Sequence, residues 1–300
     1  MKRVLGIACG TINGNNEAML KEAMKGIQDN CEAECVIVRM QDMYIKPCIG
    51  CQACIYAKLS GNSDFRCSVP AKKEHMYQFE QEIRKADAII FSAPIYNMMP
   101  PGQLITILNK LHATGDYRNF VAANPKVGAF MGTGGSDWVN YMSPIMRMIT
   151  QEYVGGYHRV VDSVIEGCVA SVFLDDKLMK RAYDLGKNVA NALVTGDTSW
   201  KGENGVCPVC HDHLLEVRKD GFYCPACDIK LDMADKAGTP SFSATEKVIS
   251  HNRFGEWGMK QHFKLLGMGG MKQKLGKKKI IQGHAKYDGD DMIIKFPPIE

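Results

Sequence analysis

The chain has 300 residues, of which 45% are hydrophobic and 23% charged, and its formal net charge is +4. This composition excludes a disordered or fibrous protein, and the length predicts two domains or one large domain with an appendage. The net charge is too small to indicate a nucleic-acid binder. Twelve cysteines are the unusual feature, too sparse for a disulfide scaffold and too numerous to be incidental.

The first ten residues, MKRVLGIACG, form a short apolar run that breaks at Gly10. Such a run is neither a secretory signal nor a membrane span, and no later stretch reaches about 20 apolar residues. We therefore expect a cytoplasmic protein without a membrane span. Thiols stay reduced there, so clustered cysteines bind metal or carry out redox chemistry.

Strand and helix patterns alternate over the first 196 residues, which we expect to form one domain. Strands that alternate with helices require a parallel sheet covered on both faces. The predicted fold class is therefore α/β, with a doubly wound five-stranded parallel sheet. In chain order, the predicted elements are a strand at 4–9, a helix at 16–27, a strand at 35–38, a helix at 73–85, a strand at 88–91, a helix at 104–111, a strand at 127–131, a helix at 138–149, a strand at 159–165 and a helix at 178–193.

Polar or glycine-containing loops follow the first, third and fourth predicted strands. In an open α/β sheet, ligands bind beyond the carboxyl ends of the strands, so these loops should form one site. The first loop, at 9–17, offers N–H groups, a hydroxyl and amides at a helix N-terminus, which suits a phosphate. An ordinary turn with an Asn helix cap is the alternative. The GxGxxG and Walker motifs are absent, which argues against a standard dinucleotide fold and a P-loop NTPase.

These loops carry a family resemblance. SAPIYNMMPPGQL at 92–104 and MGTGGSD at 131–137 resemble the flavin loops of the NAD(P)H-dependent FMN reductases, and Thr11 with GNNE at 14–17 resembles their phosphate loop. The resemblance implies a flavodoxin-like fold that binds FMN. It places the phosphate at Thr11, Asn13, Asn15 and Asn16, the isoalloxazine ring on Pro94, Ile95, Tyr96, Asn97 and Met98, and the pyrimidine edge near Thr133, Gly134 and Gly135.

One departure from that family concerns the phosphate. The first loop lacks the Arg that is common in these proteins, and Asn13 lies near its place. Either the affinity for phosphate is lower, or a residue elsewhere in the chain substitutes for that Arg.

The first cysteine group lies in an insert at 47–67. Cys48, Cys51 and Cys54 have C-x2-C-x2-C spacing, and Cys67 offers a fourth thiolate, an arrangement typical of [4Fe–4S] ligation. The run resembles the compact motif of the iron-sulfur flavoproteins, which join such a cluster to FMN. Cys67 departs from that motif because a wider gap separates it from Cys54. Retained cysteines without a cluster, a zinc site and a redox-active thiol pair are the alternatives.

The second cysteine group predicts a small metal-binding ribbon at 205–233. Cys207 and Cys210 form one CPxC knuckle, and Cys224 and Cys227 form another. Two such pairs meet across a hairpin and close a tetrahedral zinc site, and a rubredoxin-like iron is the alternative. The metal replaces the core that a module of about 25 residues cannot build. We expect a structural or docking role for zinc, and an electron relay only for iron.

The extension at 240–300 is basic, and five lysines crowd 272–279. One or two helices are predicted at 243–266. We expect the extension to pack on a neighbouring subunit with its lysines solvated. The alternative is a positive face that attracts an acidic ferredoxin.

These features predict a flavin-dependent oxidoreductase that transfers electrons between a [4Fe–4S] cluster, FMN and an external partner. That partner is a ferredoxin, NAD(P)H or a small-molecule electron acceptor. The cofactors carry the chemistry, no catalytic nucleophile is expected, and Tyr96 and Asn97 orient or tune the flavin. The alternatives are an NAD(P)H-dependent FMN or quinone reductase without a cluster, and a non-catalytic redox sensor. The resemblance also implies a homodimer or higher homo-oligomer, and no nucleic acid is expected as a partner.

Overall fold

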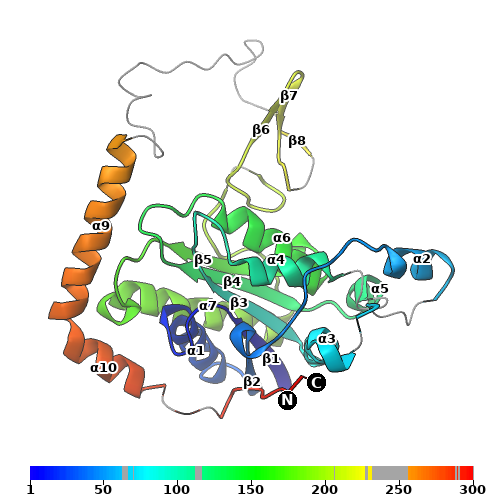
Figure 1. Cartoon of the computed structure of the whole chain (residues 1–300), viewed down its shortest axis with the longest axis horizontal. Coiled ribbons are helices and arrows are strands. Elements are labelled where there is room, and N and C mark those ends of the chain that lie inside the picture. The colour runs from blue at the N-terminus through cyan, green and yellow to red at the C-terminus, as the bar shows by residue number, and fades with distance from the viewer. Residues whose placement is uncertain are drawn as a thin grey trace.

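A five-stranded parallel sheet forms the centre of the molecule (Figure 1). The computed structural model describes residues 1–62, 67–69, 71–111, 117–205, 207–226, 229–231, 256–287, 289 and 291–299. The strand order is β2-β1-β3-β4-β5, the flavodoxin-like order, in which the direction of strand addition across the sheet reverses between β1 and β3. The predicted fold class is confirmed. The strands are β1 (Lys2–Ala8), β2 (Ala33–Arg39), β3 (Ala88–Pro94), β4 (Val127–Thr133) and β5 (Val160–Glu166).

Helices cover both faces of this sheet, so β3 and β4 are buried along their whole length. One face packs against α1 (Asn15–Gln28) and α7 (Asp176–Thr195). The other packs against α3 (Met76–Lys85), α4 (Gly102–Asn109), α5 (Tyr117–Ala123) and α6 (Met142–Val154). The apolar residues that predicted the first helix, among them Leu20 and Met24, lie fully buried in the first of these two cores.

Two glycines let α1 and α7 cross at close range. A Cβ on Gly26 would lie 2.2 Å from the carbonyl oxygen of Tyr183, and one on Gly186 would lie 1.9 Å from that of Ala23. No side chain fits at either position, so each helix backbone packs directly against the other.

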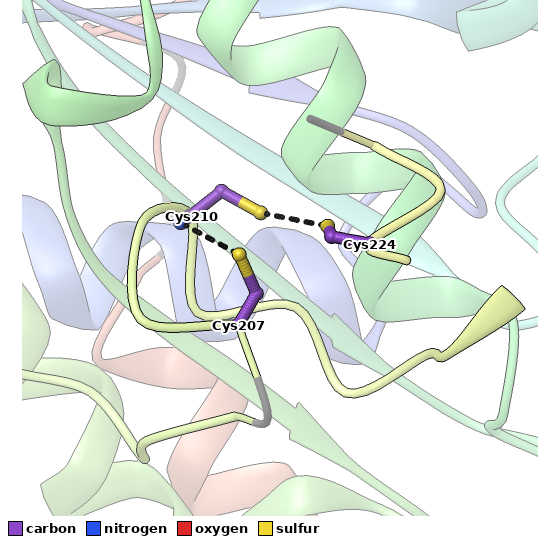
Figure 2. Close-up of side chains that lie close together, drawn as sticks. All are labelled: Cys207, Cys210 and Cys224. Carbon is purple, nitrogen blue, oxygen red and sulfur yellow. Dashed lines mark hydrogen bonds between the residues drawn. The ribbon is translucent and has the colours of Figure 1, made fainter. Parts of the chain in front are cut away.

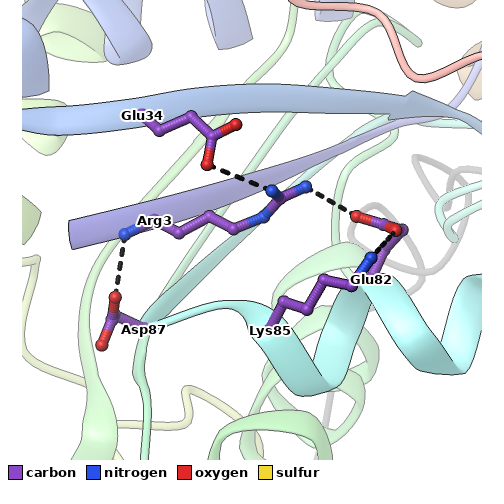
Figure 3. A network of polar contacts seen from close by, with 5 residues as sticks. All are labelled: Arg3, Glu34, Glu82, Lys85 and Asp87. Atoms are coloured by element: carbon purple, nitrogen blue, oxygen red, sulfur yellow. Dashed lines mark hydrogen bonds and ion pairs between the residues drawn. The ribbon is translucent and has the colours of Figure 1, made fainter. Parts of the chain in front are cut away.

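A polar network fixes the amino end of the sheet (Figure 3). The guanidinium of Arg3 donates to Glu34 on β2, at 3.1 Å, and to Glu82 on α3, at 2.6 Å. The backbone N–H of Arg3 donates to Asp87, and Lys85 donates to the other oxygen of Glu82. The network joins β1, β2 and α3 at the end of the sheet away from the predicted ligand loops.

Two helix starts differ from the predictions. Pro144 was expected near the middle of its helix, but α6 begins only at Met142, which places Pro144 in the first turn, where its missing N–H costs no hydrogen bond. Gly155 ends α6 in the left-handed conformation (φ 96°). The helix predicted from Lys73 begins at Met76, after a separate 3-10 turn at Ala71–Lys73.

In the part of the chain beyond α7 that the structure describes, there are a small three-stranded sheet and two helices. The sheet contains β6 (Glu216–Arg218), β7 (Gly221–Tyr223) and β8 (Lys230–Leu231), paired antiparallel. The helices are α9 (Glu256–Leu275) and α10 (Lys277–Ala285). Most of the helical segment predicted at 243–266 lies outside the described residues.

Within the chain, α10 and the terminal segment of the extension pack on the sheet domain, and packing of the extension on a neighbouring subunit stays a prediction. Gly283 lies against Phe173, and Lys279 forms an ion pair with Asp176 at 2.9 Å. Further on, the terminal segment at 291–299 pairs with the outer edge of β2. Its residue Ile293 lies opposite Ile37 of that strand. This pairing covers a strand edge that would otherwise present unpaired backbone groups. Among the helices that the structure describes, none has the length and apolar character needed to cross a bilayer.

Candidate functional site

A cavity of about 430 Å³ opens at the carboxyl ends of β1, β3 and β4. The loops after these strands were predicted to form one site, and the structure brings them together around this cavity. Residues from the region after β5 and from the C-terminal helices complete the lining. The lining residues are Thr11, Ile12, Asn13, Gly14, Asn15, Asn16, Pro94, Tyr96, Thr133, Gly134, Ser171, Gln273, Ile280 and His284.

The first loop turns sharply from β1 into α1. Gly10 has a φ of 97°, and a Cβ there would lie 3.0 Å from the ring of Pro94, so a glycine allows the loops after β1 and β3 to touch. The N–H groups of Asn15, Asn16 and Glu17 form the first turn of α1, where no helix carbonyl is available to accept from them. This turn is therefore a site for an anion.

The side chains of Asn15 and Asn16 hold the neighbouring loops together. Asn15 donates to the carbonyl of Ala170 at 2.8 Å and accepts from the N–H of Val172. Asn16 exchanges two hydrogen bonds with the backbone of Thr133 at the end of β4. Both residues were predicted at the phosphate and both line the cavity, while their side-chain amides bond to neighbouring loops.

A buried group of charges lies behind this loop. Glu17 accepts from Arg39 at 2.8 Å and from Lys21 at 2.9 Å, and all three side chains are at most 8% exposed. Burial acts to raise the pKa of Glu17, but the hydrogen bonds from Arg39 and Lys21 outweigh it and lower the pKa below its ordinary value. Arg39 also donates to the side chain of Asn13. One carboxylate and two cations leave a net positive charge beside the loop.

The loop after β3 reverses in a tight hairpin. Tyr96 and Met99 exchange backbone hydrogen bonds at 2.8 and 3.0 Å, and the two residues between them, Asn97 and Met98, have φ values of 47° and 71°. Two successive positive φ values are those of a type I′ turn. Tyr96 is 55% exposed at the cavity, whereas Ile95 and Met98 are buried in the core.

The loop after β4 forms the facing wall. Thr133 is buried, and its hydroxyl donates to the carbonyl of Glu166 on β5. Gly134, Gly135 and Ser136 follow with φ values of 129°, 69° and 53°, and of these Gly134, which has no side chain, lines the cavity. A loop of this kind offers N–H and C=O groups rather than side chains to a ligand.

The predicted flavin residues thus divide into two sets. Eight of them line the cavity: Thr11, Asn13, Asn15, Asn16, Pro94, Tyr96, Thr133 and Gly134. Ile95, Asn97, Met98 and Gly135 lie beside it and shape the two loops. The first helix turn and the backbone walls suit the phosphate and the ring of FMN, so the residues present fit this cofactor.

Sequence reasoning missed the residues that reach the cavity from far along the chain. Ser171 comes from the segment after β5, and Gln273, Ile280 and His284 come from α9 and α10. No local motif marks them. The lack of an Arg in the first loop was the one signal that a distant residue contributes.

The first cysteine group lies on an irregular segment after β2 and on α2 (Ala53–Leu59). Cys48 and Cys51 are exposed, and Cys54 and Cys67 are half-buried. Among the described residues, no three of these sulfur atoms lie within 4.8 Å of one another.

The insert nevertheless folds back on itself. The sulfur of Cys51 lies 3.7 Å from the hydroxyl of Ser68, the residue next to Cys67. The N–H of Ala53 at the start of α2 and the Ser68 hydroxyl lower the pKa of Cys51. Burial raises the pKa of Cys54, and the neighbouring Cys48 and Cys51 add to this. Ser68 and the backbone around it thus lie close to Cys51, although 16 residues separate the two in the sequence.

The second cysteine group forms a compact sulfur site (Figure 2). The sulfur atoms of Cys207, Cys210 and Cys224 are buried and lie within 4.8 Å of one another, with 3.6 Å between those of Cys210 and Cys224. Zn–S bonds of about 2.3 Å in a tetrahedron place sulfurs about 3.8 Å apart, so the arrangement fits one zinc ion. Cys227, the predicted fourth ligand, lies outside the described residues.

Backbone N–H groups support this site. The N–H groups of Val209 and Cys210 donate to the sulfur of Cys207 at 3.4 and 3.5 Å. Burial opposes ionisation of Cys207, but these donors outweigh it and lower its pKa. A CPxC knuckle therefore prepares a thiolate, which is the form that binds metal.

The ribbon docks on the main sheet domain through stacked side chains. The rings of Trp200 and His211 are 5.0 Å apart and nearly parallel, and the guanidinium of Arg147 lies 4.3 Å from the Trp200 ring. Burial and the charge of Arg147 lower the pKa of His211, so the ring stacks in its neutral form. His211 is thus a docking residue and not merely an exposed neighbour of the knuckle.

Known proteins resemble this chain in both sequence and fold. Residues 2–150 match the model of the family described as NADPH-dependent FMN reductase. The flavone synthase cfoJ of Aspergillus candidus is 27% identical over an alignment of 301 positions that covers 89% of each protein. Among solved structures, a flavone reductase superposes with a TM-score of 0.62 and 22% identity over 99% of both chains. The likeness of fold therefore extends beyond the sheet domain.

Proposed function

Because this chain belongs to the family of NADPH-dependent FMN reductases and is an FMN-dependent oxidoreductase, we propose that it passes two electrons from NAD(P)H, through FMN, to a conjugated C=C bond of a flavone-like acceptor. The observation that carries the proposal is the meeting of the three predicted flavin loops around one cavity. The overall change is acceptor + NAD(P)H + H⁺ → dihydro-acceptor + NAD(P)⁺.

When bound, FMN would supply the hydride chemistry, because it accepts a hydride from a nicotinamide and gives one to an acceptor. The chain binds and orients it. The first turn of α1 would hold the phosphate through N–H groups, and the backbone beside Gly134 would hold the polar edge of the ring. Tyr96, at the open side of the cavity, would stack an aromatic acceptor above the ring.

The class of acceptor is supported by two features. A relative that spans 89% of this chain is named a flavone synthase. The cavity is also lined by two exposed apolar side chains, Ile12 at 43% and Tyr96 at 55%, and Met99, the bridge partner of Tyr96, is 44% exposed. Such a rim suits a planar, mostly apolar ring system. A quinone is the second acceptor that this rim accommodates.

The test is turnover with defined acceptors. Protein reconstituted with FMN is given NADH or NADPH together with a flavone, menadione or no acceptor, under argon. We expect the flavone to gain two hydrogens, seen as a 2 Da increase by mass spectrometry. Reduction of menadione with no change in the flavone would instead assign the protein as a quinone reductase.

The role of Tyr96 has its own test. Tyr96→Ala should raise the KM for the aromatic acceptor about tenfold, because a stacked ring pair contributes roughly 1 kcal/mol beyond its buried area. Tyr96→Phe keeps the stack and should stay within twofold of the wild type. Equal losses in both variants would indicate that the hydroxyl, and not the ring face, is the important group.

A [4Fe–4S] cluster on Cys48, Cys51, Cys54 and Cys67 is the second candidate feature, which would add one-electron transfer to the flavin. It is favoured by the approach of Ser68, and hence of Cys67, to Cys51. Iron and acid-labile sulfide are measured on protein purified without oxygen. About four of each per chain would support the cluster. Sulfide below about 0.2 per chain would contradict it and leave the flavin as the one redox cofactor of the proposal.

We also propose that Cys207, Cys210, Cys224 and Cys227 hold zinc, and that the chain acts as a homodimer in the cytoplasm. The sulfur spacing supports the metal. Elemental analysis should find one zinc per chain, and iron in its place would indicate a rubredoxin-like site. Light scattering should give about twice the 33.3 kDa chain mass. A 33.3 kDa particle would contradict the dimer.

A further inference from the structure

His284 lies at the phosphate end of the cavity although it is far from the phosphate loop in sequence. It lines the cavity described above together with Thr11, Asn13 and Asn15. It also lines an adjoining cavity of about 220 Å³, which includes Asn13 and the buried Lys21. His284 therefore stands where the two cavities meet, beside Asn13.

The helix that carries His284 is held in place at several points. The His284 ring packs edge-on against Phe173 with 4.8 Å between centroids, and Gly283 is so close to Phe173 that a Cβ would lie 2.3 Å from that ring. One turn earlier, Lys279 pairs with Asp176. After the helix, Tyr287 donates to Glu22 on α1, and its carbonyl accepts from Lys21. These contacts fix the position of His284 relative to the first turn of α1.

The charges around the loop make a cation useful at this point. The loop has no Arg or Lys of its own between Cys9 and Glu17. Both Arg39 and Lys21 are engaged with Glu17, which takes up one of their two charges. A phosphate dianion at the first turn of α1 would therefore gain from one more donor that carries or acquires a positive charge.

We propose that α10 completes the FMN phosphate site, with the imidazole of His284 donating a hydrogen bond to a phosphate oxygen. The C-terminal extension is then a part of the cofactor site, supplied by the same chain, and His284 replaces the Arg that the loop lacks. Gln273 and Ile280 cover the same side of the cavity. The inference rests on FMN as the cofactor and not on the identity of the acceptor.

The test compares FMN with riboflavin, which lacks the phosphate. Dissociation constants of both flavins are measured by fluorescence quenching on apoprotein of the full chain. In the wild type FMN should bind more tightly than riboflavin. His284→Ala should weaken FMN binding at least about tenfold, as expected for a charge-assisted hydrogen bond, and change riboflavin binding less than twofold. His284→Gln keeps a donor and should recover part of the loss.

Two further variants separate this contact from packing. His213→Ala, at an exposed histidine of the ribbon, should leave both constants unchanged. Gly283→Ala displaces α10 from Phe173 without altering His284, and should weaken FMN more than riboflavin. The inference is overturned if His284→Ala weakens both flavins equally, or neither. If the wild type itself binds no FMN, the cofactor assignment fails instead.

Discussion

Three cysteines of the ribbon lie buried and close together, whereas the four cysteines after β2 lie exposed or half-buried along an irregular segment. The difference comes from the backbone around them. In the ribbon, the N–H groups of Val209 and Cys210 donate to the sulfur of Cys207, and Cys224, directly after β7, brings its sulfur to the same point. The C-x2-C-x2-C run has no paired strands to fold it, so its spacing alone does not determine how its sulfur atoms are arranged.

The largest expected effect comes from the ribbon. Cys207→Ser should abolish metal binding there, because a small ribbon is built around its ion and a structural zinc contributes on the order of 10 kcal/mol. Zinc content by elemental analysis should fall from about one to below 0.1 per chain. Cys31→Ser, at a half-buried cysteine outside both groups, should leave it unchanged. Retained zinc in Cys207→Ser would remove the contrast between the two groups.

The position of the first cysteine group depends instead on contacts between the segment that carries it and other parts of the chain. Glu74 accepts from the N–H of Lys46, just before Cys48, and pairs with Lys110, with both side chains at most 2% exposed. Glu74→Gln leaves a buried cation without its counter-charge and should lower the free energy of unfolding by about 3–5 kcal/mol, measured in urea. The double variant with Lys110→Met should be less destabilised. If the single and the double variant lose the same free energy of unfolding, the unpaired buried cation is not the cause of the loss.

Thiol accessibility tests the same contrast without mutation. In the folded protein, iodoacetamide should modify Cys48 and Cys51 within minutes, because both are exposed. Cys207, Cys210 and Cys224 should react only after a chelator removes their metal. Peptide mass spectrometry identifies the modified sites. Protection of Cys48 and Cys51 that is lost on chelation would place a metal centre in the first group as well.

The smallest expected effect concerns the flavin. None of the first cysteine group lines the cavity, so Cys51→Ser should change the FMN dissociation constant less than twofold. Flavin fluorescence measures it. A loss of more than about tenfold would mean that the insert and the flavin site are coupled, which the described contacts do not show.

Much of the sheet domain could be predicted because its signals are local. Apolar runs marked the five strands, and glycine-rich loops marked their carboxyl ends, which a doubly wound sheet must bring together. Helix starts were less certain, since Pro144 and Lys73 carry no capping signal that separates a first turn from a helix interior. Of the four cysteines outside the two groups, Cys9 and Cys35 are buried, and Cys31 and Cys168 are half-buried.

The sequence by itself determined the parallel α/β fold, the three loops that meet at one cavity and the close spacing of the ribbon cysteines, because periodicity, glycine positions and cysteine spacing act over a few residues. Only the tertiary structure decided the rest. It turned the side chains of Asn15 and Asn16 toward neighbouring loops, and it brought His284 to the phosphate loop from more than 260 residues away. Contacts of that range depend on how whole elements pack, and no local pattern encodes them.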